Sequence, residues 1–234
     1  MRLAGSLIAA ATAIAPVGGA ALAAPVVLEL YTSQGCSSCP PADALLTELA
    51  GLDGVIALAL HVDYWDYLGW KDQFARPQHT ARQRAYAKAA RSRSIFTPEM
   101  VVQGQDRLKG HDAPRVMDEI ARLRAIPAVA DVDLKRDGEA LQVHVKPAGD
   151  APVEGPADVF LVRFIPSEGV SIEGGENAGK EMTYTNIVTD WQKIGQWDGA
   201  GAMDLRYDDA GAGPLAVIVQ RSHMGPVLTA AELQ

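Results

Sequence analysis

Apolar and polar positions follow one another along the chain in blocks that predict a sheet with helices on its faces. Unbroken apolar, β-branched runs predict strands that are buried on both sides. Leucines at helical spacing, and an Ala- and Arg-rich stretch without internal glycine or proline, predict helices. The order is β-α-β-α-β-β-α, at residues 26–31, 42–50, 55–62, 77–92, 99–103, 106–109 and 112–123.

The pattern changes after Pro127. Residues 129–135 and 140–146 alternate around a turn, which predicts a hairpin. A segment rich in Gly, Asn and Asp follows, with one possible helical turn or edge strand near 184–194. Further strands are expected at 159–165, 215–220 and 225–229. The predicted fold class is therefore α/β, with one domain over residues 24–126 and a small antiparallel β domain or sandwich over 127–234.

The first residues have the pattern of a signal peptide. Arg2 precedes an apolar, Ala-rich stretch over residues 3–15, and small residues lead to Ala23. We expect cleavage after residue 23, with the mature chain starting at Ala24. An uncleaved anchor is the alternative, but Pro16 and two glycines interrupt the apolar stretch. The predicted location is periplasmic or secreted, with no membrane span after processing.

Charge and cysteine content narrow the possible functions. The formal net charge of −8 argues against nucleic acid as a partner, because binding to phosphates needs a basic surface. The two cysteines, Cys36 and Cys39, are separated by two residues. A disulfide is chemically allowed in an exported protein. It would close almost no loop and would restrict the unfolded chain very little, so the spacing favours chemistry over a structural role.

The Cys36–Cys39 pair follows a predicted strand and opens a predicted helix. The positive end of a helix dipole stabilises a thiolate there, so Cys36 is the expected nucleophile and Cys39 the expected resolving cysteine. This context predicts a redox-active dithiol. A structural or inert disulfide is one alternative. Half of a metal site is another, although no second such pair and no close pair of histidines completes four ligands.

These features resemble a thioredoxin fold in the order of elements, the position of the cysteine pair and a Thr97-Pro98 step before a strand. Longer segments are similar to an exported bacterial family known as domain of unknown function 1223. The resemblance implies a fold and a compartment but no substrate. It is carried by residues 29–43, 61–72, 175–180 and 184–188.

The resemblance also implies roles for individual residues. Pro98 would form a cis peptide bond that faces the dithiol, and the backbone of Thr97 would hold a bound peptide. Glu29 would be a supporting carboxylate that relays the proton of Cys39. The alternatives are a trans proline that starts a strand and a glutamate at the margin of the sheet. No Trp precedes Cys36, and Ser-Ser stands between the cysteines, so the direction of electron flow stays open.

An aromatic segment follows the second predicted strand. Tyr64 and Trp65 belong to it, and strand ends on this side of an α/β sheet border the ligand site. We expect these two residues to form a wall that receives a substrate polypeptide. The alternative is a loop that packs its own aromatic rings. We expect His61 and Asp63 to be a satisfied pair at the strand end and not metal ligands.

The segment Gly174–Lys180 matches most of a phosphate-binding loop, with the pattern G-x4-G-K. Glu181 stands where that loop requires Ser or Thr, and no strand-to-helix transition of a nucleotide-binding domain is apparent. We therefore interpret it as a glycine-rich loop of the second region that packs against the first.

The function predicted from the sequence is an exported thiol-disulfide oxidoreductase that acts through Cys36 and Cys39. Its partners would be exported protein thiols or a redox partner protein, and no cofactor is expected. One alternative is a non-catalytic binding module of thioredoxin fold with an idle disulfide. Another is a periplasmic copper-handling protein that uses the two thiols.

Overall fold

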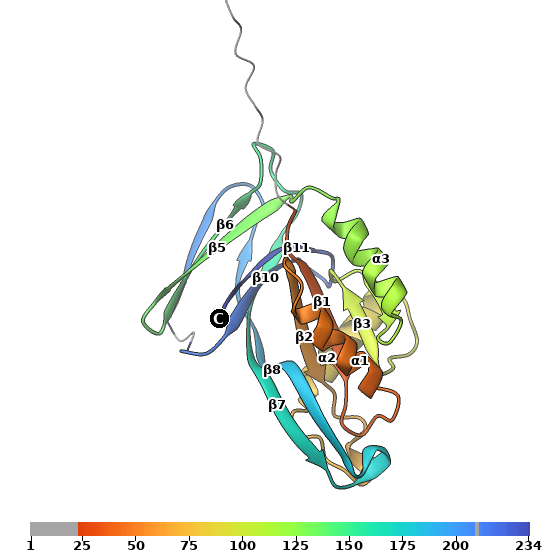
Figure 1. Ribbon diagram of the computed structural model, residues 1–234. Helices are drawn as coiled ribbons and strands as arrows, with labels where there is room; N and C mark the ends of the chain where they lie inside the picture. The colour runs from red at the N-terminus through yellow and green to blue at the C-terminus, as the bar shows by residue number, and fades with distance from the viewer. Residues whose placement is uncertain (1–22, 209–210) are drawn as a thin grey trace, which may run out of the picture.

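A computed structural model describes residues 23–208 and 211–234, and over these residues the protein is mixed α/β, with a large sheet and few helices (Figure 1). The large sheet has eight strands in the order β11-β10-β7-β8-β2-β1-β3-β4, and a second sheet has the order β5-β6-β9. The helices are α1 (Pro40–Ala50), α2 (Pro77–Ala89) and α3 (Ala113–Arg124), with 3-10 turns η1 (Asp66–Leu68) and η2 (Gly175–Asn177). The strands are β1 (Val26–Thr32), β2 (Val55–His61), β3 (Glu99–Val102), β4 (Asp106–Lys109), β5 (Ala130–Asp137), β6 (Ala140–Pro147), β7 (Ala157–Ile172), β8 (Lys180–Trp197), β9 (Met203–Tyr207), β10 (Leu215–Arg221) and β11 (Val227–Leu233).

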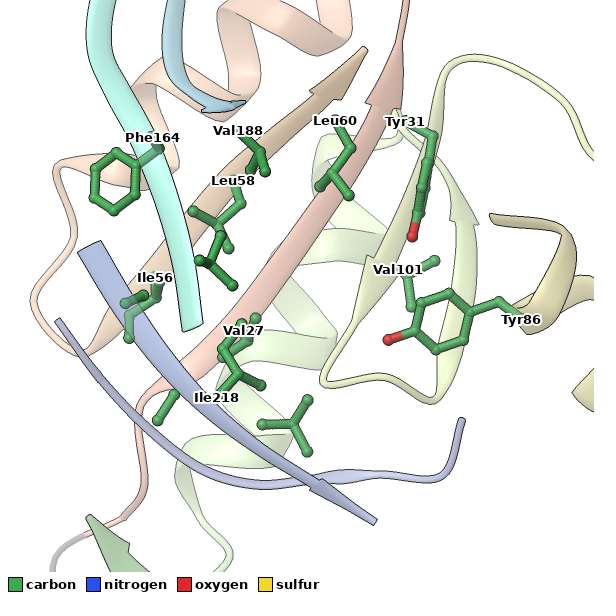
Figure 2. Close-up of a cluster of buried hydrophobic side chains, with 14 of the residues drawn as sticks. Val27, Tyr31, Ile56, Leu58, Leu60, Tyr86, Val101, Phe164, Val188 and Ile218 are labelled. Atoms are coloured by element: carbon green, nitrogen blue, oxygen red, sulfur yellow. The ribbon is translucent and has the colours of Figure 1, made fainter. Parts of the chain in front are cut away.

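The elements predicted before residue 127 are all present, and β1 is central to them. It pairs in parallel with β2 and antiparallel with β3. Because side chains alternate between the faces of a strand, β1 contributes to two cores. Leu28 and Leu30 pack with α1 and α3 on one face. Val27 and Tyr31 pack on the other face, with Tyr86 of α2. Figure 2 shows this second core, in which Tyr31 and Tyr86 lie together at one end.

The later strands extend this same sheet. β8 lies beside β2, with Ala59 and Ile187 as partners in a parallel pairing, and β7 continues the sheet from there. The prediction of an edge strand or helical turn near 184–194 is wrong, because β8 has a neighbour on each side and runs for 18 residues. Strands from both sides of residue 127 therefore share one sheet. The division into two domains at that residue stays a prediction about folding units.

The three-stranded sheet covers the far end of the large sheet. It contains the predicted hairpin, as β5 and β6, and a strand that the sequence did not indicate, β9. Apolar residues of β6, such as Leu141 and Val143, pack against Leu161 of β7 and Val217 of β10 in a third core. The two sheets thus bury one apolar layer between them.

All but the last residue of the predicted signal peptide, 1–23, lie outside the described residues. Within the described part of the chain, no helix is both long enough and apolar enough to cross a bilayer.

Candidate functional site

Cys36 and Cys39 form a disulfide between the end of β1 and the start of α1. Cys39 is the residue that precedes the helix, and Pro40 occupies its first turn. The amides of Ala42 and Asp43 donate to the Cys39 carbonyl at 2.8 and 3.1 Å. Both cysteines are 0% exposed, whereas Ser37 and Ser38 between them are exposed. The disulfide therefore lies directly beneath two surface serines, at the helix end that stabilises a thiolate.

Trp65 joins this loop to the predicted substrate segment. Its indole Nε1 donates to Thr97 Oγ1 at 2.8 Å, and an added Cβ at Gly35 would lie 3.1 Å from the Trp65 Cβ. Trp65 thus contacts the residue before Cys36 on one side and Thr97 on the other. The Tyr64 hydroxyl donates to Gln83 Oε1 at 3.2 Å, and its ring is tilted against that of Trp65.

The peptide bond between Thr97 and Pro98 is cis, which agrees with the expectation from the resemblance. Pro98 is buried beside the first turn of α1. An added Cβ at Gly110 would lie 3.0 Å from the Pro98 Cβ and 3.2 Å from the Ala42 Cβ, so Gly110 leaves room for both. The structure therefore brings the cysteine loop, Trp65 and the Thr97-Pro98 step together.

Glu29 lies on the opposite face of the sheet from this group. Its side chain points to the same side as Tyr31, away from α1, because the faces alternate along β1. Arg82 donates to both of its carboxylate oxygens, at 2.7 and 2.8 Å. The hydroxyls of Tyr86 and Tyr31 donate to it at 2.6 and 2.9 Å. The structure thus gives Glu29 a buried, fully bonded environment and does not bring it to the disulfide.

A different carboxyl group, that of Asp43, lies on the disulfide side of the sheet. It is four residues after Cys39 on α1, so the two residues share one face of the helix. Asp43 is 5% exposed, and neither of its oxygens has a hydrogen-bond partner among the residues that the structure describes. Burial raises its pKa from the ordinary 3.8 to about 7, although His61 and the nearby Thr32 hydroxyl act to lower it.

His61 and Asp72 form a buried pair next to Asp43. His61 Nδ1 lies 2.7 Å from Asp72 Oδ2, and the amides of Gln34 and Phe74 also donate to this carboxylate. Burial alone would raise the pKa of Asp72, but His61 and these amides outweigh it and hold the pKa below its usual value. In the described part of the chain, His61 Nε2 and Thr32 Oγ1 have no hydrogen-bond partner. A group of buried polar atoms therefore borders Asp43.

The predicted pairing of His61 with Asp63 is wrong. Asp63 instead accepts a hydrogen bond from Thr80 Oγ1 at 2.6 Å, because it points to α2. Asp43 and Asp72 were not predicted as site residues. The spacing of Asp43, one helical turn after Cys39, was a usable signal for it. Asp72 could be placed only by the fold, since ten residues that include η1 separate it from His61.

The tip of the β7–β8 hairpin, residues 173–180, covers the cysteine loop. Figure 1 shows this long hairpin running past the ends of the shorter strands. Asn177 Nδ2 donates to the carbonyls of Gln34 and Cys36, each at 2.9 Å. The amide of Ser37 donates to Glu176 Oε2 at 3.3 Å. The glycine-rich segment is thus a loop that packs against the first region, and η2 forms its tip.

The described residues contain no group of three or more His, Cys, Asp or Glu side chains arranged to hold a metal ion. The two sulfur atoms are bonded to each other in this structure. Any copper binding would therefore need the reduced thiols.

Comparisons with known proteins agree with this architecture. An X-ray crystal structure of a protein from Agrobacterium tumefaciens is similar, with 31% sequence identity, a TM-score of 0.78, and coverage of 90% of this chain and 94% of that one. HBP35 of Porphyromonas gingivalis shares the fold at 15% identity and a TM-score of 0.57, with 91% of this chain and 75% of that one covered. No curated protein matches the chain significantly. The family model described as protein of unknown function (DUF1223) matches residues 27–220, and the chain therefore belongs to this family.

Proposed function

We propose that this protein is an exported thiol-disulfide oxidoreductase with a thioredoxin-like first half, and that Cys36 and Cys39 are its reactive pair. The observation that carries the proposal is the disulfide at the start of α1 with the buried, unbonded carboxyl of Asp43 one turn behind it on the helix. A structural disulfide has no need of a proton-exchanging group nearby, whereas exchange of a buried thiol does.

The strand arrangement supports the thioredoxin-like part of the proposal. A parallel β1–β2 pair with α1 between them is followed by β3 and β4, which run antiparallel at the edge of the sheet. The position of Pro98 beside the first turn of α1 fits the role of a residue that faces the reactive pair. The substrate chain would then lie along Thr97, with Trp65 as one wall.

The proposed reaction transfers two electrons through two disulfide exchanges. The Cys36 thiolate attacks a substrate disulfide, a bond forms between Cys36 and one substrate sulfur, and the other substrate sulfur leaves as a thiolate. The Cys39 thiol then loses its proton and attacks Cys36 Sγ. The Cys36–Cys39 disulfide forms, and the second substrate sulfur leaves. The substrate disulfide is reduced to two thiols, and the protein dithiol is oxidised. The reverse sequence oxidises a substrate dithiol.

Asp43 takes the supporting role that the sequence suggested for Glu29. It is the carboxyl group on the same helix face as Cys39, and its pKa of about 7 lets it accept and return a proton near neutral pH. Glu29 is held by Arg82 and two tyrosines on the far side of the sheet. We therefore propose Asp43 as the proton acceptor for Cys39.

One observation favours a second function. Both cysteines are fully buried, which is the state expected of an idle disulfide in a non-catalytic binding module. The two functions differ in whether Cys36 exchanges with other proteins.

A trapping experiment tests the proposal. In a Cys39→Ala variant expressed in its exporting host, Cys36 cannot be released from a mixed disulfide, so substrate proteins should accumulate as covalent adducts. Adducts that disappear on reduction, and that are absent from a Cys36→Ala/Cys39→Ala control, are the expected result. A well-expressed Cys39→Ala protein without any such adduct would support the binding module instead.

A further inference from the structure

The cover over the disulfide comes from a distant part of the chain. Asn177 lies about 140 residues after the cysteine loop, yet its side chain is 1% exposed and is bonded at both ends. Its Nδ2 donates to the carbonyls of Gln34 and Cys36, and its Oδ1 accepts from Lys180 Nζ at 2.7 Å. The amide is thus held firmly in one orientation over the loop.

The hairpin tip is also seated by its shape. An added Cβ at Gly174 would lie only 2.6 Å from the Gly69 carbonyl oxygen. Gly175 has a φ of +72° and lies against the Trp70 Cβ, so a side chain is excluded there by both backbone conformation and space. Trp70 in turn donates to Gln34 Oε1 at 2.8 Å. The tip therefore closes against the aromatic segment as well as against the cysteine loop.

The seated tip lies against the loop that holds the sulfur atoms. A thiolate must reach one sulfur of a disulfide directly, so a disulfide with 0% exposed cysteines cannot exchange until its cover moves. Ser38 Oγ lies 3.4 Å from Cys36 Sγ, and the tip is hydrogen-bonded to the backbone of this same loop, so the loop and the tip together cover the disulfide. Moving the tip breaks the three hydrogen bonds made by Asn177 and Glu176 to the loop backbone.

In these three bonds the tip supplies the same kinds of donor and acceptor that a polypeptide backbone would supply. Asn177 supplies two N–H donors to carbonyls, and Glu176 supplies one acceptor to the Ser37 amide. An extended peptide that approaches the loop offers the same kinds of group and could replace them. A small thiol could not, and would leave the Gln34 and Cys36 carbonyls and the Ser37 amide without those bonds.

We propose that the hairpin tip is a gate, and that Asn177 and Glu176 are specificity-determining residues that open the disulfide to polypeptide thiols and shield it from small ones. The inference rests on the proposed function for its biological meaning, since it names polypeptides as the substrate class. The proposal gives the β7–β8 hairpin, which follows residue 127, a role in controlling access to Cys36 and Cys39.

Reduction kinetics test the gate. The oxidised full chain is mixed with dithiothreitol or with a short reduced cysteine peptide, and free Cys36 and Cys39 are trapped by alkylation over time. In the dithiothreitol reaction a thiolate attacks one sulfur, and the reagent's second thiol then closes the reagent into a cyclic disulfide, so the two cysteines take up both electrons. In the peptide reaction one peptide thiolate forms a mixed disulfide with one cysteine, and a second peptide thiolate attacks the peptide sulfur, which frees that cysteine and leaves a disulfide between two peptides. The wild type should react faster with the peptide than with dithiothreitol at equal thiolate concentration.

Asn177→Ala should be reduced by dithiothreitol about ten- to thirty-fold faster than the wild type, as expected for the loss of two hydrogen bonds. The preference for the peptide should shrink by the same factor. The equilibrium constant for reduction of the Cys36–Cys39 disulfide by glutathione should stay within about twofold of the wild-type value. The matched control is Asn186→Ala, on strand β8 of the same hairpin and away from the cysteine loop, which loses one bond to the Ala57 carbonyl and should leave the rate unchanged. Equal rates for wild type and Asn177→Ala, or equal acceleration by the control, would overturn the gate.

Two further measurements keep the test decisive. Glu176→Ala changes an exposed residue and should fold even if Asn177→Ala does not; we expect an acceleration of about threefold, and its absence would count against the gate. Turnover of insulin disulfides by the reduced protein is assayed in parallel. Acceleration of dithiothreitol reduction without any insulin turnover in any variant would contradict the proposed function and still support the gate.

Discussion

A buried acid lies on each side of the sheet at β1, Glu29 on β1 itself and Asp43 on α1, and the two acids have opposite environments. Glu29 on the α2 side is 0% exposed and accepts hydrogen bonds from Arg82, Tyr31 and Tyr86. Asp43 on the α1 side is 5% exposed, and its oxygens have no hydrogen-bond partner within the described residues. Burial is nearly the same, so the difference lies in the partners. The hydrogen bonds of Glu29 hold neighbouring elements together, whereas burial without a partner raises the pKa of Asp43 to about 7.

This contrast assigns the two acids different roles, since Glu29 connects structural elements and Asp43 does not. The Glu29 network joins β1 to α2 and, through the bond from Arg82 to Gln220, to β10. The Asp43 side chain makes no hydrogen bond to another element in the described structure, and it lies one helical turn after Cys39. The acid predicted from the sequence to support catalysis thus has a structural environment, and an acid without a predicted role has the properties that exchange requires.

The largest expected effect comes from breaking the paired side. Arg82→Met should lower the free energy of unfolding by about 3–5 kcal/mol, because it leaves the Glu29 charge buried without its cation. The change in the free energy of unfolding is measured by urea denaturation at neutral pH. The matched control is Arg122→Met, which removes an exposed arginine that pairs with Glu119 and should change stability little. Similar small losses in both variants would show that the Glu29 network does not hold the sheet to α2.

A smaller effect is expected from the unpaired side, and it depends on pH. Below about pH 4, Asp43 is protonated in both states. Between about pH 4 and 7 the unfolded chain releases this proton while the folded protein keeps it, so rising pH favours unfolding. Asp43→Asn removes that penalty. The stability of the variant relative to wild type should therefore increase by up to about 4 kcal/mol from pH 4 to pH 8, at about 1.4 kcal/mol for each pH unit.

Urea denaturation at several pH values checks this dependence. Asp72→Asn is the control of opposite sign, because the pKa of Asp72 is lowered in the folded protein. Its charged form adds stability above the ordinary pKa of about 4, and that stability is lost as pH falls through the lowered value. Stability curves for Asp43→Asn and wild type that stay parallel from pH 4 to pH 8 would show that Asp43 is ionised normally in the folded protein.

Local patterns in the sequence were enough for most of the elements and for the position of the cysteine pair. The apolar runs at β1 and β2 and the proline-led helices α1 and α2 fall where the periodicity places them. The disulfide between Cys36 and Cys39 and the neighbouring Thr97-Pro98 step follow from short motifs and the family resemblance. Each of these features depends on residues that are close in sequence or on a recognisable fold.

Long-range pairings could not be predicted in the same way. β8 has a mixed polar sequence because part of it is half-exposed, so its position beside β2 has no local signal. The face on which Glu29 lies depends on the register of β1 against its helices. The contact of Asn177 with the cysteine loop bridges about 140 residues. Such contacts are decided by the packing of whole elements, which short patterns do not encode.

The reduction potential of the Cys36–Cys39 pair tests the central claim most directly. It is measured by equilibrating the protein with glutathione redox buffers, together with the pKa of Cys36 from the pH dependence of alkylation. We predict a potential between about −270 and −120 mV, the range of thiol-disulfide oxidoreductases, and a Cys36 pKa below that of free cysteine. A potential below about −300 mV with a Cys36 pKa near 8.5, as in a structural disulfide, would contradict the account.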